Sequence, residues 1–133
     1  MAIVVGFIPT PEGEAALVRG ALEARNRQMP LVVVSSKDPA REPDRAAVAR
    51  FEAELENVTA RLAGEGLEYD VRRVDTGRMA SEDIVDVADE VGAEMIVIGL
   101  RRRRPIGKLI MGSQAQQILL VAECPVLAVK AAR

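Results

Sequence analysis

Short apolar runs and longer amphipathic segments alternate along this chain of 133 residues. The runs are rich in Val and Ile and are mostly continuous, which is typical of strands whose sheet is covered on both faces. Between them, apolar residues recur every three or four positions, as they do on one face of a helix. The pattern therefore predicts five strands that alternate with four helices. The strands are expected at residues 3–8, 31–35, 69–74, 94–98 and 126–129.

Local signals place the ends of the predicted helices. Thr10 followed by Pro11 predicts the start of the first helix, because Thr caps free N–H groups and Pro suits the first helical position. The glycines at 64 and 66 predict the end of the second helix, and Ser81 is expected to cap the third. Two buried faces are expected: Val48, Phe51, Leu55, Val58 and Leu62 on the second helix, and Ala115, Ile118, Leu119 and Ala122 on the fourth.

This order of elements predicts a single α/β domain over residues 1–133. Strand–helix–strand units connect by right-handed crossovers, so the five strands are expected to form a parallel sheet with helices on both faces, a three-layer sandwich. Ligands bind such sheets beyond the carboxyl ends of the strands, where the strand order reverses. The fourth strand is expected to end at Gly99, so the residues that follow it are expected on the ligand-binding edge.

Composition and charge exclude several classes of function. A net charge of −2 argues against a general nucleic-acid binder, which carries a broad basic excess. The chain has no histidine, so the commonest general base and the commonest nitrogen ligand of zinc are missing. Its one cysteine permits no internal disulfide, no apolar run approaches the ~18 residues of a membrane span, and no signal peptide is recognisable. We therefore expect a cytoplasmic protein that binds neither nucleic acid nor membrane.

Four successive arginines, at 101–104, follow the fourth predicted strand. A run of charge is ordinarily a solvated loop, but the position of this run on the ligand-binding edge favours phosphate binding. Gly112 and Ser113 precede the fourth helix and serve either as an ordinary cap or as an anion site, because free N–H groups at a helix start attract anions. The candidate phosphate-binding residues are Gly99, Arg101, Arg102, Arg103, Arg104, Lys108, Gly112, Ser113 and Gln114.

Gly99, Gly112 and Ser113 have the mutual spacing of the Gly-X2-Gly-X9-Gly-Ser motif of the universal stress protein family, which the chain resembles over essentially its whole length. The ending Cys124-Pro125-Val126 is also similar to that of the family. The resemblance implies a Rossmann-like sheet in the order 3-2-1-4-5, like that of the adenine nucleotide alpha hydrolases. It implies a role in the stress response, an ATP site between the first and fourth strands, and homodimers joined through the last strand, Val126, Leu127, Ala128 and Val129.

Two positions depart from the family motif. Arg102 stands in place of the second glycine, and Ile8 stands where ATP-binding members carry an aspartate that contacts the nucleoside. The resemblance places the nucleoside-side pocket at Ile8, Pro9, Thr10 and Val34. Losing one polar contact costs about 1–3 kcal/mol, and charge-assisted bonds from the arginines contribute a similar amount each. We therefore expect the phosphates to be held better than the base.

Three functions remain open from the sequence. The first is a regulatory module that binds ATP or another phosphorylated ligand, for which the sequence gives no indication of a magnesium requirement. The second is a nucleotide-free dimeric module that interacts with proteins and has lost ATP binding. The third, a slow ATPase, requires a carboxylate base such as Asp38 or Asp75, because no histidine is present.

Overall fold

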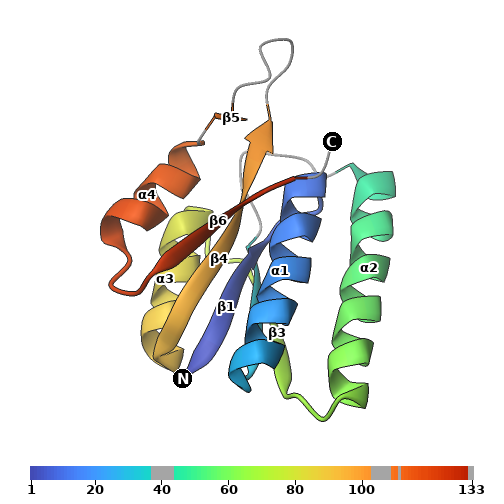
Figure 1. Ribbon diagram of the computed structural model, residues 1–133. Coiled ribbons are helices and arrows are strands. Elements are labelled where there is room, and N and C mark those ends of the chain that lie inside the picture. The colour runs from blue at the N-terminus through green and yellow to red at the C-terminus, as the bar shows by residue number, and fades with distance from the viewer. Residues whose placement is uncertain (37–43, 103–108, 111, 132–133) are drawn as a thin grey trace.

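The computed structural model describes residues 1–36, 44–102, 109–110 and 112–131, and its elements alternate along the chain as the sequence predicts (Figure 1). The strands are β1 (Ala2–Phe7), β2 (Leu31–Ser36), β3 (Tyr69–Val74), β4 (Ala93–Arg102), β5 (Leu109–Ile110) and β6 (Val126–Lys130). The helices are α1 (Pro11–Arg27), α2 (Arg45–Gly64), α3 (Ala80–Val91) and α4 (Ser113–Val121).

A five-stranded parallel sheet runs through the centre of the molecule in the order β3-β2-β1-β4-β6. Because β6 is the fifth strand of the sequence prediction, the predicted order 3-2-1-4-5 is confirmed. Ile3 of β1 pairs with Leu31 of β2 on one side and with Met95 of β4 on the other. The sheet order reverses between β1 and β4, which places the expected ligand-binding crevice beyond the carboxyl ends of these two strands.

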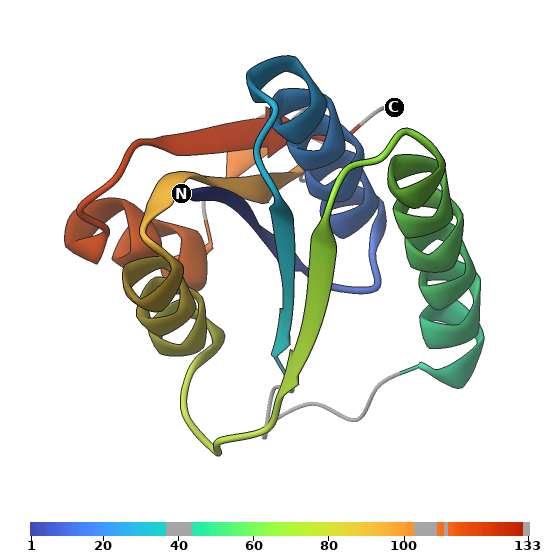
Figure 2. The ribbon, with the colours of Figure 1, turned by 90° about the horizontal axis from the view of Figure 1, so that it is seen from below.

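Helices cover both faces of the sheet, α1 and α2 on one face and α3 and α4 on the other (Figure 2). Successive residues of β1 point to opposite faces: Ile3 and Val5 contact the cluster under α1 and α2, and Val4 contacts the cluster under α3 and α4. Burying one such aliphatic side chain contributes roughly 1.5–3 kcal/mol, so the two clusters hold the three layers together.

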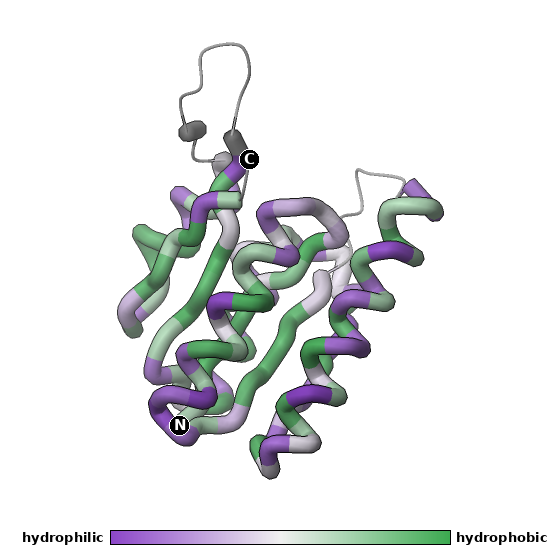
Figure 3. The backbone as a smooth tube through the Cα atoms, turned by 45° about the vertical axis from the view of Figure 1, so that its right-hand side comes forward, coloured by the Kyte–Doolittle hydropathy of each residue, from purple (hydrophilic) through white to green (hydrophobic). Residues whose placement is uncertain are grey.

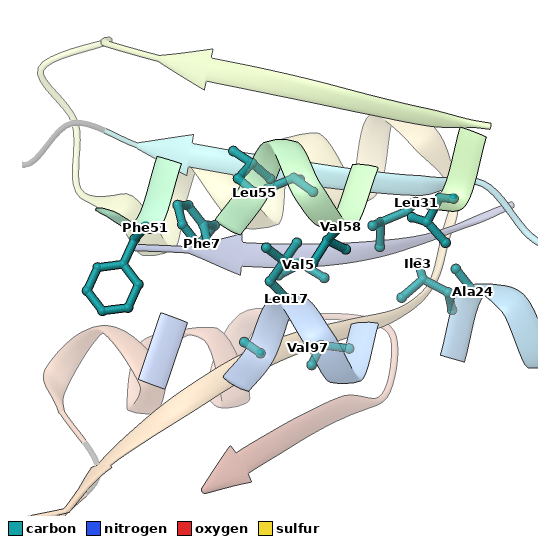
Figure 4. Packing of buried hydrophobic residues seen from close by; sticks show 13 residues of the cluster. Ile3, Val5, Phe7, Leu17, Ala24, Leu31, Phe51, Leu55, Val58 and Val97 are labelled. Carbon is teal, nitrogen blue, oxygen red and sulfur yellow. The ribbon is translucent and has the colours of Figure 1, made fainter. Parts of the chain in front are cut away.

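The cluster under α1 and α2 shows how the helix pattern produces burial. Phe51, Leu55 and Val58 of α2 are buried in the cluster (Figure 4). Leu62 is buried too, as the spacing predicts, whereas Val48 at the start of the predicted face is only half-buried. The central strands are continuously hydrophobic, whereas hydrophobic and hydrophilic residues alternate along the helices (Figure 3). Among the described residues, no helix combines the length and hydropathy that a membrane span needs.

Three local expectations differ from the structure. β4 does not end at Gly99 but continues to Arg102, because its last two residues pair with the antiparallel strand β5. Ser81 is not the cap of α3; the helix is preceded by Met79, whose side chain makes no capping hydrogen bond. On α4, Ile118 is buried as predicted but Leu119 is 41% exposed, so the buried face of this short helix is narrower than expected.

Candidate functional site

The turn between β1 and α1 forms one wall of the expected crevice. Thr10 precedes α1, and its Oγ1 accepts a hydrogen bond from the Gly13 N–H (3.1 Å), while Pro11 fills the first helical position. A Cβ on Gly13 would lie 1.8 Å from the carbonyl oxygen of Ile8, so the turn requires glycine there. The Ile8 side chain is 40% exposed, and Pro9 and Thr10 are half-buried. The turn therefore offers an apolar side chain where a polar contact to a nucleoside would be needed.

Gly99 lies in β4 directly against the first turn of α1. A Cβ at this position would lie 2.0 Å from the carbonyl oxygen of Glu12 and 2.9 Å from the Glu12 Cβ. Contacts under 3.0 Å do not occur without a shift of the neighbouring atoms, and here the first of these neighbours is backbone. Gly99 therefore allows α1 to pack on β4, a structural requirement that exists without any ligand.

Arg101 is an exposed residue two positions beyond Gly99 on the same strand. Its Nε lies 3.8 Å from Oε1 of Glu12, whose side chain is 12% exposed, whereas the Arg101 side chain is 60% exposed. The two ends of this ion pair thus differ in burial. The acid lies between α1 and β4, and much of the guanidinium group is open to solvent at the carboxyl end of the sheet.

Helix α4 begins at the same edge. Gly112 precedes the helix in an extended conformation (φ −66°, ψ 163°), and a Cβ there would have no atom of the described residues within 4 Å. The Ser113 side chain is exposed, and the cap residue Gly112 has no side chain that could accept from the first N–H groups of the helix. Ile110 pairs with Arg101, and two extended residues span at most about 7 Å, so the start of α4 lies close to the end of β4. The open helix start and Arg101 thus lie at the same edge of the sheet.

Two other predicted site residues lie inside the fold. The Gln114 Oε1 accepts a hydrogen bond from the Ser81 N–H (2.9 Å) and so serves as the cap that Met79 does not provide for α3. Val34 is 1% exposed and belongs to the hydrophobic cluster beneath α3. Gln114 thus joins α4 to α3, and Val34 packs β2 against α3. Both contacts connect segments that are distant in the sequence.

A buried carboxylate that the sequence did not indicate as part of a site also lies near this edge. Asp83, in the first turn of α3, is 3% exposed. Its two oxygens accept hydrogen bonds from the hydroxyls of Ser36 (2.7 Å) and Thr76 (2.8 Å). Ser36 ends β2 and Thr76 follows β3, so one carboxylate joins three elements. Ser and Thr are common residues, and no local sequence pattern predicts that Ser36 and Thr76 bind the Asp83 carboxylate.

The opposite end of the molecule has a hollow of about 200 Å³ between the ends of α3 and α4 and the start of β4. Its ionisable rim includes the acids Asp89 and Glu123, which disfavour an anionic ligand. The Cys124 thiol also lines this hollow, and its pKa is raised above the ordinary value mainly by burial. An anion is therefore better accommodated at the edge where β1 and β4 end.

Several predicted residues cannot be placed. Arg103, Arg104, Lys108 and Asp38 lie outside the described residues, and only the backbone of Arg102 is described, in β4. Asp75 directly follows β3. In the described parts of the chain, no group of His, Cys, Asp or Glu side chains is arranged to hold a metal ion.

The predicted dimer edge, Val126 to Val129, lies in β6 at the border of the sheet. These four side chains are half-buried, and β4 is the strand with which β6 pairs in the described structure. Three consecutive residues of the neighbouring helix α4 are exposed, Leu119 by 41%, Leu120 by 82% and Val121 by 48%. This flank therefore carries both a strand edge and exposed apolar side chains.

Comparisons with known proteins agree with this architecture. The model of the universal stress protein family matches residues 1–130. A universal stress protein of Mycolicibacterium smegmatis is 40% identical over 130 residues, which cover 96% of each chain. Two solved universal stress protein structures from Archaeoglobus fulgidus each cover 98% of both chains. One is 38% identical with a TM-score of 0.76, and the other, in complex with dAMP, is 33% identical with a TM-score of 0.72. This chain therefore belongs to the universal stress protein family.

Proposed function

We propose that this domain is a regulatory module that binds a nucleotide, or another small phosphorylated ligand, beyond the carboxyl ends of β1 and β4. The observation that carries the proposal is the open start of α4, where Gly112 leaves space for a ligand beside exposed Ser113, at the same edge of the sheet as Arg101. The Archaeoglobus fulgidus relative in complex with dAMP supports a nucleotide as the ligand.

The chemistry of this edge suits a phosphate group. Free N–H groups at the start of α4 are donors for an anion, and the Ser113 hydroxyl is a further donor. The exposed part of the Arg101 guanidinium provides planar donors, and a well-formed bond of this kind contributes about 1.5–3 kcal/mol. The Ile8 side chain provides no acceptor for a sugar hydroxyl, so the phosphate is held better than the nucleoside. ATP is one candidate nucleotide, and AMP contains the same recognised groups.

The Gly112→Ala substitution tests this site. The added methyl group meets no atom of the residues that the structure describes, but it occupies the space in which a phosphate approaches the backbone. We expect nucleotide affinity, measured by isothermal titration calorimetry with AMP and ATP, to fall by about tenfold or more. The control is Gly64→Ala at the end of α2, where a Cβ also meets nothing within 4 Å. Equal affinity of both variants and the unchanged protein would contradict the assignment of Gly112.

A second property, homodimerisation through β6, is proposed from the flank that β6 and α4 share. An edge strand presents unpaired N–H and C=O groups, which pair readily with another strand. The exposed side chains of Leu119, Leu120 and Val121 add apolar surface that a partner would cover. A second copy of this chain presents the same edge, and two such edges pair in antiparallel fashion about a twofold axis. A dimer that binds none of the nucleotides would favour the interaction module over the nucleotide-binding module.

A further inference from the structure

Glu12 differs from an ordinary surface acid, because it packs against β4 and its side chain is mostly buried. It is the second residue of α1, and its carbonyl oxygen and Cβ fill the space that the missing side chain of Gly99 leaves. Its own side chain is 12% exposed and faces the carboxyl end of β4. The chain thus holds a mostly buried carboxylate at the sheet edge where an anionic ligand is proposed to bind.

Arg101 compensates this carboxylate only in part. The separation of Nε and Oε1 is 3.8 Å, which is long for a charge-assisted hydrogen bond, and the arginine side chain is 60% exposed. Within the described part of the chain, Glu12 is the one acid that pairs with Arg101. A phosphate that binds the open part of this guanidinium therefore lies within a few ångströms of the Glu12 carboxylate.

We propose that Glu12 is a specificity-determining residue that restricts the site to ligands of low negative charge. The inference rests on the proposed function, because it concerns the ligand of the same site. Each further ionised phosphate oxygen adds repulsion from a carboxylate that is fixed by packing and poorly reached by water. The penalty therefore grows with ligand charge, in the order cAMP, AMP, ATP, and the contacts at Gly112 are common to all three.

A simple positioning role for Glu12 predicts the opposite result. If the carboxylate served mainly to orient Arg101, its removal would release the guanidinium and weaken the binding of every phosphate ligand. Exposed ion pairs contribute little, because solvent screens them and long side chains lose entropy when they are held. The repulsion, in contrast, acts on every additional charge of the ligand. The two roles therefore differ in the sign of the effect on affinity.

The test is the Glu12→Gln variant, titrated calorimetrically with cAMP, AMP and ATP in metal-free buffer at low salt. Gln preserves the size of the side chain and removes its charge. We expect the affinity for ATP to rise by about fivefold or more and the affinity for cAMP to change by less than about twofold. The matched control is Glu14→Gln, which removes the same charge from the same turn of α1. We expect a smaller gain there, without the dependence on ligand charge.

The possible outcomes separate this inference from the proposed function. A gain that increases from cAMP to ATP in Glu12→Gln and not in Glu14→Gln supports the role of Glu12. An equal gain for all three nucleotides, or a loss, overturns that role and leaves nucleotide binding intact. If neither the unchanged protein nor the variants bind any of the three nucleotides, the proposed function fails and the inference fails with it. Circular dichroism of each variant confirms that it is folded.

Discussion

At the scale of single residues, two glycines of one sequence motif meet different physical demands. Gly99 is enclosed by the backbone of α1, since a Cβ there would lie 2.0 Å from the carbonyl oxygen of Glu12. Gly112 is open, since no atom in the described part of the chain lies within 4 Å of the same added carbon. The first glycine is thus required by packing between α1 and β4, and the second leaves room for a ligand at the start of α4.

This difference predicts separate effects on stability. Gly99→Ala should lower the free energy of unfolding by at least about 2 kcal/mol, because the new methyl group can be accommodated only by moving backbone. Gly112→Ala should change it by less than about 1 kcal/mol, the loss expected at a helix cap. Urea denaturation followed by circular dichroism measures both. Similar unfolding midpoints for Gly99→Ala and the unchanged protein would show that α1 adjusts without cost.

Cys124 provides a prediction about pH. Burial is the largest cause that raises the pKa of this thiol, and the charge of Asp89 raises it further. A raised pKa leaves less thiolate at neutral pH, and the thiolate is the form that reacts. We expect iodoacetamide to modify Cys124 more slowly in the folded protein than in urea at pH 7.5, with the folded rate increasing at alkaline pH. Equal rates in both states would contradict a protected thiol.

The same shift has a consequence for stability. Because the pKa of the Cys124 thiol is higher in the fold than in the unfolded chain, the fold favours the protonated thiol. This contribution is complete below the ordinary thiol pKa and is lost as the pH rises through the raised value. The Cys124→Ser variant lacks this titration. Its stability should therefore decrease less than that of the unchanged protein above about pH 9.

At the scale of secondary-structure elements, one carboxylate holds three segments together. Asp83 of α3 accepts hydrogen bonds from Ser36 at the end of β2 and from Thr76 after β3. Asp83 is 3% exposed, and replacing it by Ala removes this acceptor from the half-buried Ser36 and from the exposed Thr76. We expect the free energy of unfolding to fall by about 1–3 kcal/mol, and by roughly half as much for Asp83→Asn, whose amide retains one acceptor. Urea denaturation measures both variants.

Asp86 supplies the matched control on the same helix. Its side chain is 57% exposed and pairs with Arg78, whose side chain is 45% exposed. Exposed ion pairs of this kind contribute at most about 1 kcal/mol, because solvent screens the charges. Asp86→Ala should therefore change the stability much less than Asp83→Ala. Equal losses at the two positions would contradict the special contribution that the two hydroxyl contacts give to Asp83.

The ends of helices and strands are predicted from the sequence where neighbouring residues determine them, and they are misplaced where distant residues do. The start of α1 is encoded by adjacent residues, Thr10 and Pro11, and is confirmed by the capping bond to Gly13. The start of α3 is predicted two residues too late, because its cap comes from Gln114, which is distant in the sequence. The end of β4 is misplaced for a similar reason. The charged Arg101 is typical of a loop, but its pairing with Ile110 continues β4 to Arg102.

At the scale of the whole molecule, the topology follows from apolar periodicity together with the family resemblance. Val4 and Val33, in continuous apolar runs, identify strands covered on both faces, and both are fully buried. The site is less predictable, because it depends on side chains that meet only after folding. The contact of Glu12 with Arg101 requires α1 to pack on β4 at Gly99, and no spacing in the sequence encodes that distance.

The outer edge of β6 leads to the last prediction, which concerns association of two copies. The Ile96 N–H donates to the carbonyl oxygen of Pro125 (3.0 Å), so the backbone groups of Leu127 and Val129 also face β4. The alternate residue Ala128 then directs its N–H toward the free edge. Ala128→Pro removes this outward donor without removing a bond to β4, and proline is tolerated on edge strands.

We expect the unchanged protein to sediment as a dimer at micromolar concentration and Ala128→Pro to sediment as a monomer with a similar melting temperature. Ala128→Ser is the matched control, because it changes the side chain at the same position, keeps the outward N–H and should remain dimeric. Leu120→Gln, which removes the most exposed apolar side chain of α4, should weaken the dimer in the same assay. A dimer that persists in Ala128→Pro would place the interface elsewhere, whereas a monomeric unchanged protein would reject association through β6, because the free edge would then remain unpaired.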